Sequence, residues 1–280
     1  FYQKYAATEL ADSFTDSAEG FAVNIDGNTH TDTTVKKIGT ASAQFDGSGD
    51  DLVITNSGSS SDFAFGTGDF TIELWMYANS IPSDAAILTW NGVVSGDNHI
   101  GFGYGYGSTG YFYIKADGAF IGGGSSDFAG SGTYTFPTSA WKHMALVRNG
   151  SSWVFYLDGV STLTATDAGS WLDLGSMELY LGKGNGYFNG YIDEFRVSDT
   201  ARYTGAFTPS TSAFVSDSNT ILLMHMDGSD SGTSFPYSSG TTALPGRHTI
   251  TAYGDVTNTR AEQKVGDSSI LFDGTGDYLQ

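Results

Sequence analysis

The chain has 280 residues, no cysteine, 38 glycines and a formal net charge of −19. The lack of cysteine excludes disulfides, iron–sulfur clusters and thiol catalysis, and the excess of 31 acidic over 12 basic residues disfavours nucleic-acid binding. No run of about 18 apolar residues occurs, so we expect no membrane insertion. The acidity has two interpretations, a solvated surface or calcium ligation by some Asp residues.

Short runs rich in aromatic and β-branched residues, bounded by Gly, Asn, Asp and Ser, predict strands along most of the chain. In chain order they are residues 70–78, 99–107, 111–118, 142–150, 153–160, 177–184 and 190–197. Asn149-Gly150 and Asp158-Gly159 predict hairpin turns, because these residues tolerate a positive φ. Many short antiparallel strands at a spacing of roughly 10 residues predict an all-β sandwich or barrel. One short helical turn is expected near 199–203.

Residues 190–197 place a carboxylate in an apolar row. Period-2 alternation puts Tyr191, Asp193, Phe195 and Val197 on one face of this predicted strand, opposite Ile192, Glu194 and Arg196. A carboxylate among apolar neighbours needs a metal, a positive charge or backbone N–H groups as its partner. Asp193 is therefore the best single candidate for a metal ligand.

One sequence frame occurs twice. VKKIGTASAQFDGSGDDLVI (35–54) returns as EQKVGDSSILFDGTGDYLQ (262–280), so that Phe45 recurs as Phe272, 227 positions later. A repeat of this length indicates tandem whole domains, because solenoid units run about 20–50 residues. We predict one complete domain at 1–217, with a Ser/Thr/Pro-rich linker from about 198, and the N-terminal strands of an incomplete second repeat at 218–280. The linker's aromatic residues predict that it packs along the first domain.

Several motifs in combination resemble a known family. GDFTIELWMYA (68–78), WKHMALVRNG (141–150), FYLDGV (155–160) and the segment from LYLGKG to GYFNGYIDEFRVS (179–198) are similar to the concanavalin A-like, laminin-G-type jelly roll. ARYTGAFTPSTSAF (201–214) and TILLMHMDGSDSGTSF (220–235) resemble laminin-G-like repeats of tailed-bacteriophage structural proteins. The resemblance implies an antiparallel two-sheet jelly-roll sandwich of about 200 residues, usually noncatalytic and used for adhesion or structure.

The two copies differ at one position of this pattern. Phe14 to Ser17 matches the family segment F-x-D-S, whereas the second copy has Phe235 to Ser238 with Tyr237 in place of Asp. If Asp16 is a ligand in the first repeat, the second repeat must bind differently or not at all.

No catalytic motif is recognised, and we predict that the chain is not an enzyme. Glucanases of this fold use E-x-D-x-x-E on one strand, because retaining hydrolysis needs two carboxyl groups about 5–5.5 Å apart. That spacing is absent: Glu73 and Glu178 stand alone in the sequence, and alternation points Asp193 and Glu194 to opposite faces. The five His residues form no H-x-H or HExxH zinc motif, and no G-x-S-x-G occurs.

Calcium is the one cofactor that the sequence suggests. The first and last strands of such sandwiches commonly lie side by side, so Asp16, Asp46 and Asp193 are expected to converge on a structural calcium ion. The resemblance implies the same, since an edge calcium that ties the N-terminal segment to the I-D-E strand is common in the family. The alternative is that Asp46 and Asp50 only form an Asx-type turn that satisfies backbone N–H groups.

Aromatic side chains suggest a glycan-binding surface. Tyr104 and Tyr106 alternate with glycines, Tyr111 follows the next turn, and Trp90 and Trp171 stand near predicted loops. Exposed rings would offer platforms for sugar rings. The alternatives are a core aromatic layer, with glycines that permit close packing, and simple anchoring of loops by the two Trp residues.

These observations predict a noncatalytic structural or adhesive repeat domain of a virion surface appendage, a tail fibre or a capsid decoration, with cell-surface glycans as potential partners. The predicted location is extracellular or on the virion surface, and the other partners are copies of the chain or neighbouring repeats. One alternative is a subunit of an extracellular filament assembled by β-strand exchange through residues 220–280. Another is a carbohydrate-binding module of a larger secreted enzyme.

Overall fold

The structure is a computed structural model. It describes residues 21–56, 63–80, 86–90, 101–104, 112–116, 119–120, 138–166, 178–184 and 186–231, and short strands at 252–253, 257–259, 269–271 and 278–279. All regular elements in the described part are β-strands, and none of its residues lies in a helix long and apolar enough to cross a membrane. The short helical turn expected near 199–203 is absent, because these residues run along a sheet as an irregular segment.

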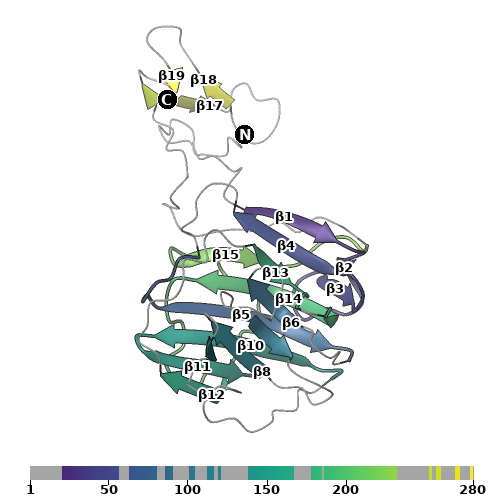
Figure 1. The fold of residues 1–280 in the computed structure, drawn as a ribbon. Helices are drawn as coiled ribbons and strands as arrows, with labels where there is room; N and C mark the ends of the chain where they lie inside the picture. The colour runs from purple at the N-terminus through teal and green to yellow at the C-terminus, as the bar shows by residue number, and fades with distance from the viewer. Residues whose placement is uncertain are drawn as a thin grey trace. The chain divides into compact units, whose positions relative to one another are not determined.

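Two antiparallel sheets form a sandwich (Figure 1), which confirms the predicted all-β two-sheet architecture. The seven-stranded sheet has the order β1-β4-β13-β6-β7-β8-β9. Its strands are β1 (Phe21–Asp26), β4 (Asp51–Asn56), β6 (Ala86–Trp90), β7 (Gly101–Tyr104), β8 (Phe112–Ala116), β9 (Ala119–Phe120) and β13 (Leu179–Leu181).

The eight-stranded sheet has the order β12-β11-β10-β5-β14-β3-β2, and β15 also pairs with β14. Its strands are β2 (His30–Asp32), β3 (Ser42–Asp46), β5 (Phe70–Ala78), β10 (Trp141–Asn149), β11 (Ser152–Leu157), β12 (Val160–Thr166), β14 (Asn189–Ser198) and β15 (Thr220–Met224). Asp158 and Gly159 both have positive φ (49° and 76°) in the two-residue turn between β11 and β12, as the Asp-Gly pair predicts.

A β-bulge in β14 changes the predicted face assignment. The register of β14 against β5 shifts between Asp193, which is opposite Trp75, and Arg196, which is opposite Glu73. Glu194 has a φ of 52° at this point. Because one extra residue is inserted, Arg196 returns to the face of Asp193, and Phe195 moves to the opposite face. The alternation predicted for 190–197 is therefore wrong beyond Asp193.

The chain divides into two compact units, residues 22–242 and residues 1–21 with 243–280. In the second unit, β16 (Ala252–Tyr253) pairs with β19 (Tyr278–Leu279), and β17 (Thr257–Thr259) pairs with β18 (Ser269–Leu271). Thr257 is opposite Leu271 in this unit, and His30 is opposite Gln44 in the first. His30 and Gln44 precede Thr257 and Leu271 by 227 positions, the offset of the repeated frame. The repeated sequence frame thus folds with the same local strand register in both units.

The sequence-based boundary near 218 falls within the unit of residues 22–242. β15, which the repeat frame assigns to the second repeat, is hydrogen-bonded to β14 of the first sandwich. All five residues of β15 are buried. The opening strand of one sequence repeat is therefore part of the preceding sandwich.

Candidate functional site

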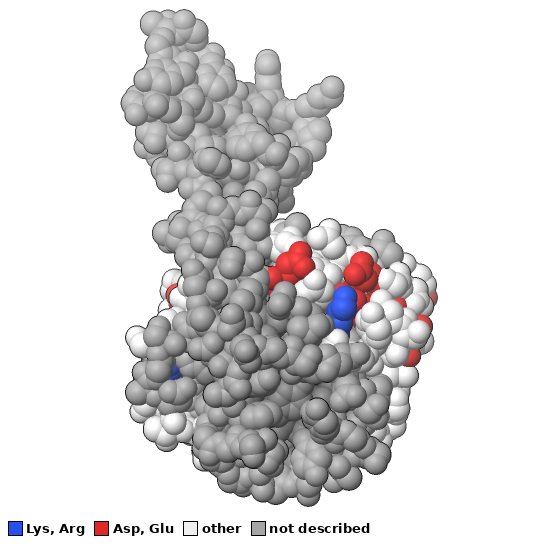
Figure 2. Space-filling view, in the orientation of Figure 1, with Lys and Arg blue, Asp and Glu red and all other residues white. Residues whose placement is uncertain are grey.

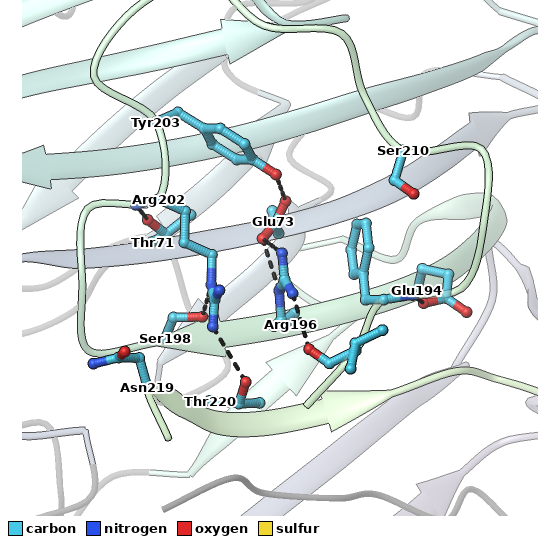
Figure 3. Close-up of polar contacts among 12 residues, drawn as sticks. Thr71, Glu73, Glu194, Arg196, Ser198, Arg202, Tyr203, Ser210, Asn219 and Thr220 are labelled. Atoms are coloured by element: carbon cyan, nitrogen blue, oxygen red, sulfur yellow. Dashed lines mark hydrogen bonds and ion pairs between the residues drawn. The ribbon is translucent and has the colours of Figure 1, made fainter. Parts of the chain in front are cut away.

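Glu73 is fully buried and is the centre of a polar network on one face of the eight-stranded sheet (Figure 3). Its Oε1 accepts hydrogen bonds from Nε (2.8 Å) and Nη2 (2.5 Å) of Arg196. Its Oε2 accepts a hydrogen bond from the Tyr203 hydroxyl (2.7 Å) and lies 3.2 Å from Nε2 of His143. Both oxygens thus have hydrogen-bond partners, and the side chain is buried.

The electrostatics of the network keep Glu73 ionised. Burial alone would raise the pKa of Glu73, but the His143 hydrogen bond and the Arg196 charge outweigh it and hold the pKa below its usual range. Burial and the Glu73 charge raise the pKa of Tyr203, so its hydroxyl stays a proton donor. A carboxylate fixed in this way holds structure together and is closed to a substrate.

Glu73 has no neighbouring carboxylate in the sequence, but in the fold it has three polar partners. Its partners His143, Arg196 and Tyr203 are 70, 123 and 130 residues away along the chain. No local spacing could reveal the network, because it is assembled by the pairing of β5 with β10 and β14 and by the linker. The signal that the sequence does carry is a single acidic residue at the centre of an apolar strand.

The linker after β14 covers this network, as its aromatic residues predict. The rings of Tyr203 and Phe207 stack at 3.5 Å with an interplanar angle of 4°, and they pack with Ala145, Val147 and Tyr156. Arg196 lies over the ring of Phe214, 4.4 Å from its centroid. The linker therefore seals one end of the sheet face.

Polar bonds fix both ends of the linker. Arg202 donates from Nη1 and Nη2 to Asp217 (2.9 and 2.7 Å) and from Nε to Ser198 (2.6 Å). These bonds from Arg202 hold the pKa of Asp217 well below its usual range. Thr71 of β5 donates through Oγ1 to the carbonyl of Thr200 (2.7 Å). The segment is thus held as a fixed part of the sandwich.

The linker also approaches the turn between β11 and β12. The backbone N–H of Phe207 donates to the carbonyl of Gly159 at 3.0 Å. A Cβ at Gly159 would lie 1.8 Å from the carbonyl oxygen of Phe207. Only glycine fits at this contact, in addition to its positive φ.

Asp193, the strongest sequence candidate for a metal ligand, is fully buried. Its Oδ2 accepts hydrogen bonds from the backbone N–H groups of Lys37 (2.8 Å) and Ile38 (3.0 Å), while Oδ1 has no hydrogen-bond partner among the described residues. Burial raises the pKa of Asp193 to about 7, and the charges of Glu194 and Asp227 add to this shift. The partners of this carboxylate in the structure are thus backbone N–H groups, one of the three kinds that an acid among apolar residues requires.

The structure does not bring Asp46 and Asp193 together. Asp46 lies opposite Asn189, four positions before Asp193 on β14, which corresponds to about 13 Å along a strand. Asp46 is exposed, and its Oδ1 accepts the N–H of Ser48 (2.7 Å), as the Asx-turn alternative predicts. Asp16 lies outside the described residues. Within the described part of the chain, no three or more His, Asp or Glu side chains gather to hold a metal ion.

Asp50 and Asp51, which follow the Asp46 turn, are both buried. Asp50 accepts the N–H of Asn28 and that of Asp46, each at 2.8 Å. Asp51 lies 3.4 Å from the ammonium group of Lys183, and burial raises the pKa of this carboxyl. In Figure 2 acidic side chains are prominent in the described part of the visible face, in keeping with the net charge of −19.

Most of the aromatic residues predicted to bind glycans lie beyond what the structure describes. Trp90 ends β6 and Tyr104 ends β7, two neighbouring strands of the seven-stranded sheet, and only their backbones are described. Tyr106, Tyr111 and Trp171 fall outside the described residues.

A second aromatic row, which sequence reasoning missed, crosses the eight-stranded sheet. Trp141, Tyr77 and Tyr191 are direct neighbours on β10, β5 and β14, and the row continues through Gln44 and His30. The ring centroids of Tyr77 lie 5.7 Å from Trp141 and 5.8 Å from Tyr191. Trp141, Tyr77, Gln44 and His30 are partly exposed. Strand register, which the sequence alone does not provide, would have found this row.

The fold and these sites define a two-sheet β-sandwich with a sealed polar network and a partly exposed aromatic row. The family model described as the concanavalin A-like lectin/glucanases superfamily matches residues 46–205. The chain therefore belongs to this superfamily. No curated protein sequence matches it.

Solved structures of similar fold include domain 4 of AbnA, an extracellular GH43 arabinanase from Geobacillus stearothermophilus, in complex with arabinotriose. It is 16 % identical, with a TM-score of 0.48, over 65 % of this chain and 82 % of that one. A putative carbohydrate-binding protein from Bacteroides ovatus is 15 % identical, with a TM-score of 0.48, over 93 % of this chain and 59 % of that one. The carbohydrate-binding module CBM66 from Bacillus subtilis is 14 % identical, with a TM-score of 0.32, over 64 % of this chain and 94 % of that one.

Proposed function

We propose that the sandwich is a noncatalytic structural and adhesive repeat domain of a virion surface appendage, a tail fibre or capsid decoration, that binds cell-surface glycans outside the cell. The repeated frame at a distance of 227 residues supports a role in a tandem array. The locked carboxylate of Glu73 supports the noncatalytic part, because this residue is closed to substrate and already holds four polar contacts.

The observation that carries glycan binding is the aromatic row of Trp141, Tyr77 and Tyr191. Aromatic rings bind the apolar faces of sugars, and flanking polar groups fix the orientation of a ligand. Here Gln44 and His30 continue the row, and both are partly exposed. Tyr104, Tyr106, Tyr111, Trp90 and Trp171 form a second proposed glycan surface.

A glycan array with the full chain and two matched Trp variants tests the proposal. If the row on the eight-stranded sheet binds sugars, Trp141→Ala abolishes the signal and Trp171→Ala leaves it unchanged. If Trp171→Ala abolishes the signal and Trp141→Ala leaves it unchanged, the glycan binds to the second surface instead. A blank array over many sugar classes with the unmodified chain overturns glycan binding and leaves the structural role.

The filament alternative is favoured by one observation, the docking of β15 on the edge of a sandwich. In a filament the same segment would come from another copy. Sizing by light scattering separates the two functions: a strictly monomeric chain at high concentration contradicts strand exchange between copies. A catalytic domain in the full-length polypeptide would instead favour a carbohydrate-binding module of a secreted enzyme.

A further inference from the structure

Residues 220–231, which open the second sequence repeat, lie on the first sandwich along their whole length. β15 continues the edge of β14, from Ser198 opposite Thr220 to Phe195 opposite Met224. The same edge of β14 pairs with β3 at residues 189–192. The bulge at Asp193 and Glu194 separates the two partners, so each half of this edge has its own strand.

Asp227 provides the next anchor. Its Oδ1 accepts hydrogen bonds from the backbone N–H groups of Thr40 and Ala41 (3.2 Å for Ala41) and from the Thr40 hydroxyl (2.9 Å). Gly39 has a φ of 67°, and a Cβ there would lie 2.3 Å from Asp227 Oδ1. The loop before β3 is thus shaped around this carboxylate.

The contacts continue on both sides of Asp227. Before it, Nδ1 of His225 lies 2.8 Å from Oε1 of the buried Glu194. After it, Thr31 of β2 donates through Oγ1 to the carbonyl of Ser229 (2.5 Å) and accepts the N–H of Ser231 (2.8 Å). A strand, an ion pair, a capped loop and a second backbone contact therefore follow one another within twelve residues.

We infer that residues 220–231 are a clasp with which one repeat closes the sandwich in front of it. The acceptor site consists of the β14 edge at 195–198, the 39–41 loop and Thr31. Its partner is an extended apolar strand followed by His-x-Asp-Gly from the following repeat. Without this partner, the backbone of 195–198 would be an open strand edge. Lys37, Gly39 and Ser42 recur as Lys264, Gly266 and Ser269, so the frame that includes the acceptor loop is itself repeated. The clasp is independent of glycan binding.

Hydrogen exchange of the full chain tests the clasp. Asp227→Asn removes a charged acceptor, which is worth about a tenfold change in an opening equilibrium. We expect exchange of the amides of 220–224 and of Thr40 and Ala41 to accelerate about tenfold. The matched control is Asp158→Asn in the turn after β11, which weakens the bond to the N–H of His143 (3.0 Å) and the ion pair with Lys142 (2.6 Å). Unchanged protection of 220–224 in Asp227→Asn, or equal loss in the control, overturns the inference.

A labelled peptide of residues 218–231 tests whether the acceptor site takes this segment from outside. In the unmodified chain the tethered segment competes at an effective concentration of the order of millimolar, so we expect little binding. The Asp227→Asn chain should bind the peptide at least tenfold better, and a peptide with the same substitution should not bind. His225→Ala is the second variant if Asp227→Asn does not fold. Failure of the opened chains to bind the peptide overturns the acceptor site.

Discussion

The two ends of one face of the eight-stranded sheet differ in how deeply their side chains are buried. Beneath the linker, Glu73, Arg196 and His143 are buried, and Glu73 is bonded to Arg196, His143 and Tyr203. Four residues further along β5, the row of Trp141, Tyr77 and Tyr191 has no such cover from the residues that the structure describes. The same pleated surface is thus buried where the linker returns over it and carries partly exposed aromatic rings at the other end.

The sealed end should be the more sensitive of the two, and Glu73→Gln tests this most strongly. Removing one partner of a buried ion pair leaves Arg196 without its counter-charge, which costs about 3–5 kcal/mol. The measurement is chemical unfolding followed by Trp fluorescence. Glu178→Gln is the control, because among the described residues this exposed carboxylate accepts a hydrogen bond from the Tyr180 hydroxyl alone, and we expect a change within about 0.5 kcal/mol. Equal losses in both variants would mean that the buried network contributes no more to stability than an exposed carboxylate.

Low pH should also destabilise the Glu73 network, because protonation removes the negative charge that Glu73→Gln removes. The pKa of Glu73 is lowered in the fold, so its stabilising contribution is complete above the ordinary value of 4.5 and is lost as the pH falls through the folded pKa. Because the raised pKa of Asp193 affects the unmodified chain and Glu73→Gln alike, we compare the two: the difference between their unfolding midpoints should be constant from pH 7 to about pH 5 and should shrink below pH 4.5. The Glu73→Gln variant should show a shallower decline over this range. A decline of the same slope in the variant would assign the acid sensitivity to other carboxylates.

Tyr203→Phe tests one bond between the linker and the sheet, the hydrogen bond from the Tyr203 hydroxyl to Glu73. The variant keeps the ring stack with Phe207 but loses the hydroxyl that donates to Glu73. A hydrogen bond to a buried charge is worth about 1.5–3 kcal/mol. Tyr180→Phe loses an exposed hydroxyl contact and should change stability by less than about 0.5 kcal/mol. An unchanged stability of Tyr203→Phe would mean that the hydroxyl adds nothing to the other contacts that hold the linker.

The smallest effect is expected at Asp193, and its sign reports whether calcium binds. Asn keeps an oxygen for the N–H groups of Lys37 and Ile38 and removes a buried charge, so without a metal Asp193→Asn should be neutral or slightly stabilising. If calcium is bound, EDTA lowers the Tm of the unmodified chain, and the variant has a lower Tm that no longer responds to EDTA. An unchanged melt with EDTA removes the calcium proposal.

Sequence patterns predicted strands and turns well where residue composition and turn residues indicate the same boundary. Residues 70–78 form β5 with exactly the predicted bounds, and Asp158-Gly159 makes the predicted tight turn. Alternation failed in β14, because a bulge at Glu194 inserts one residue and moves Phe195 to the other face. A bulge leaves no periodic signal, so strand periodicity is reliable only up to it.

The candidate sites were harder to predict than the strands. Asp193 could be recognised because one strand carries the whole signal, an acid among apolar residues. The convergence of Asp46 and Asp193 could not be judged, because it depends on the register between β3 and β14. The network of Glu73 and the row of Trp141 depend on several strand registers at once. Such sites are properties of the assembled sheet and not of any one segment.

Gly159 has a consequence for how relatives of this chain can vary. Its carbonyl receives the linker, and the carbonyl of Phe207 occupies the space where a side chain would begin. A substitution there would leave the turn strained and also displace the linker from the sheet. In a set of homologous sequences, glycine at 159 and an aromatic residue at 207 should therefore be gained and lost together. A relative that lacks both should have its linker on another path and Glu73 replaced by an apolar residue.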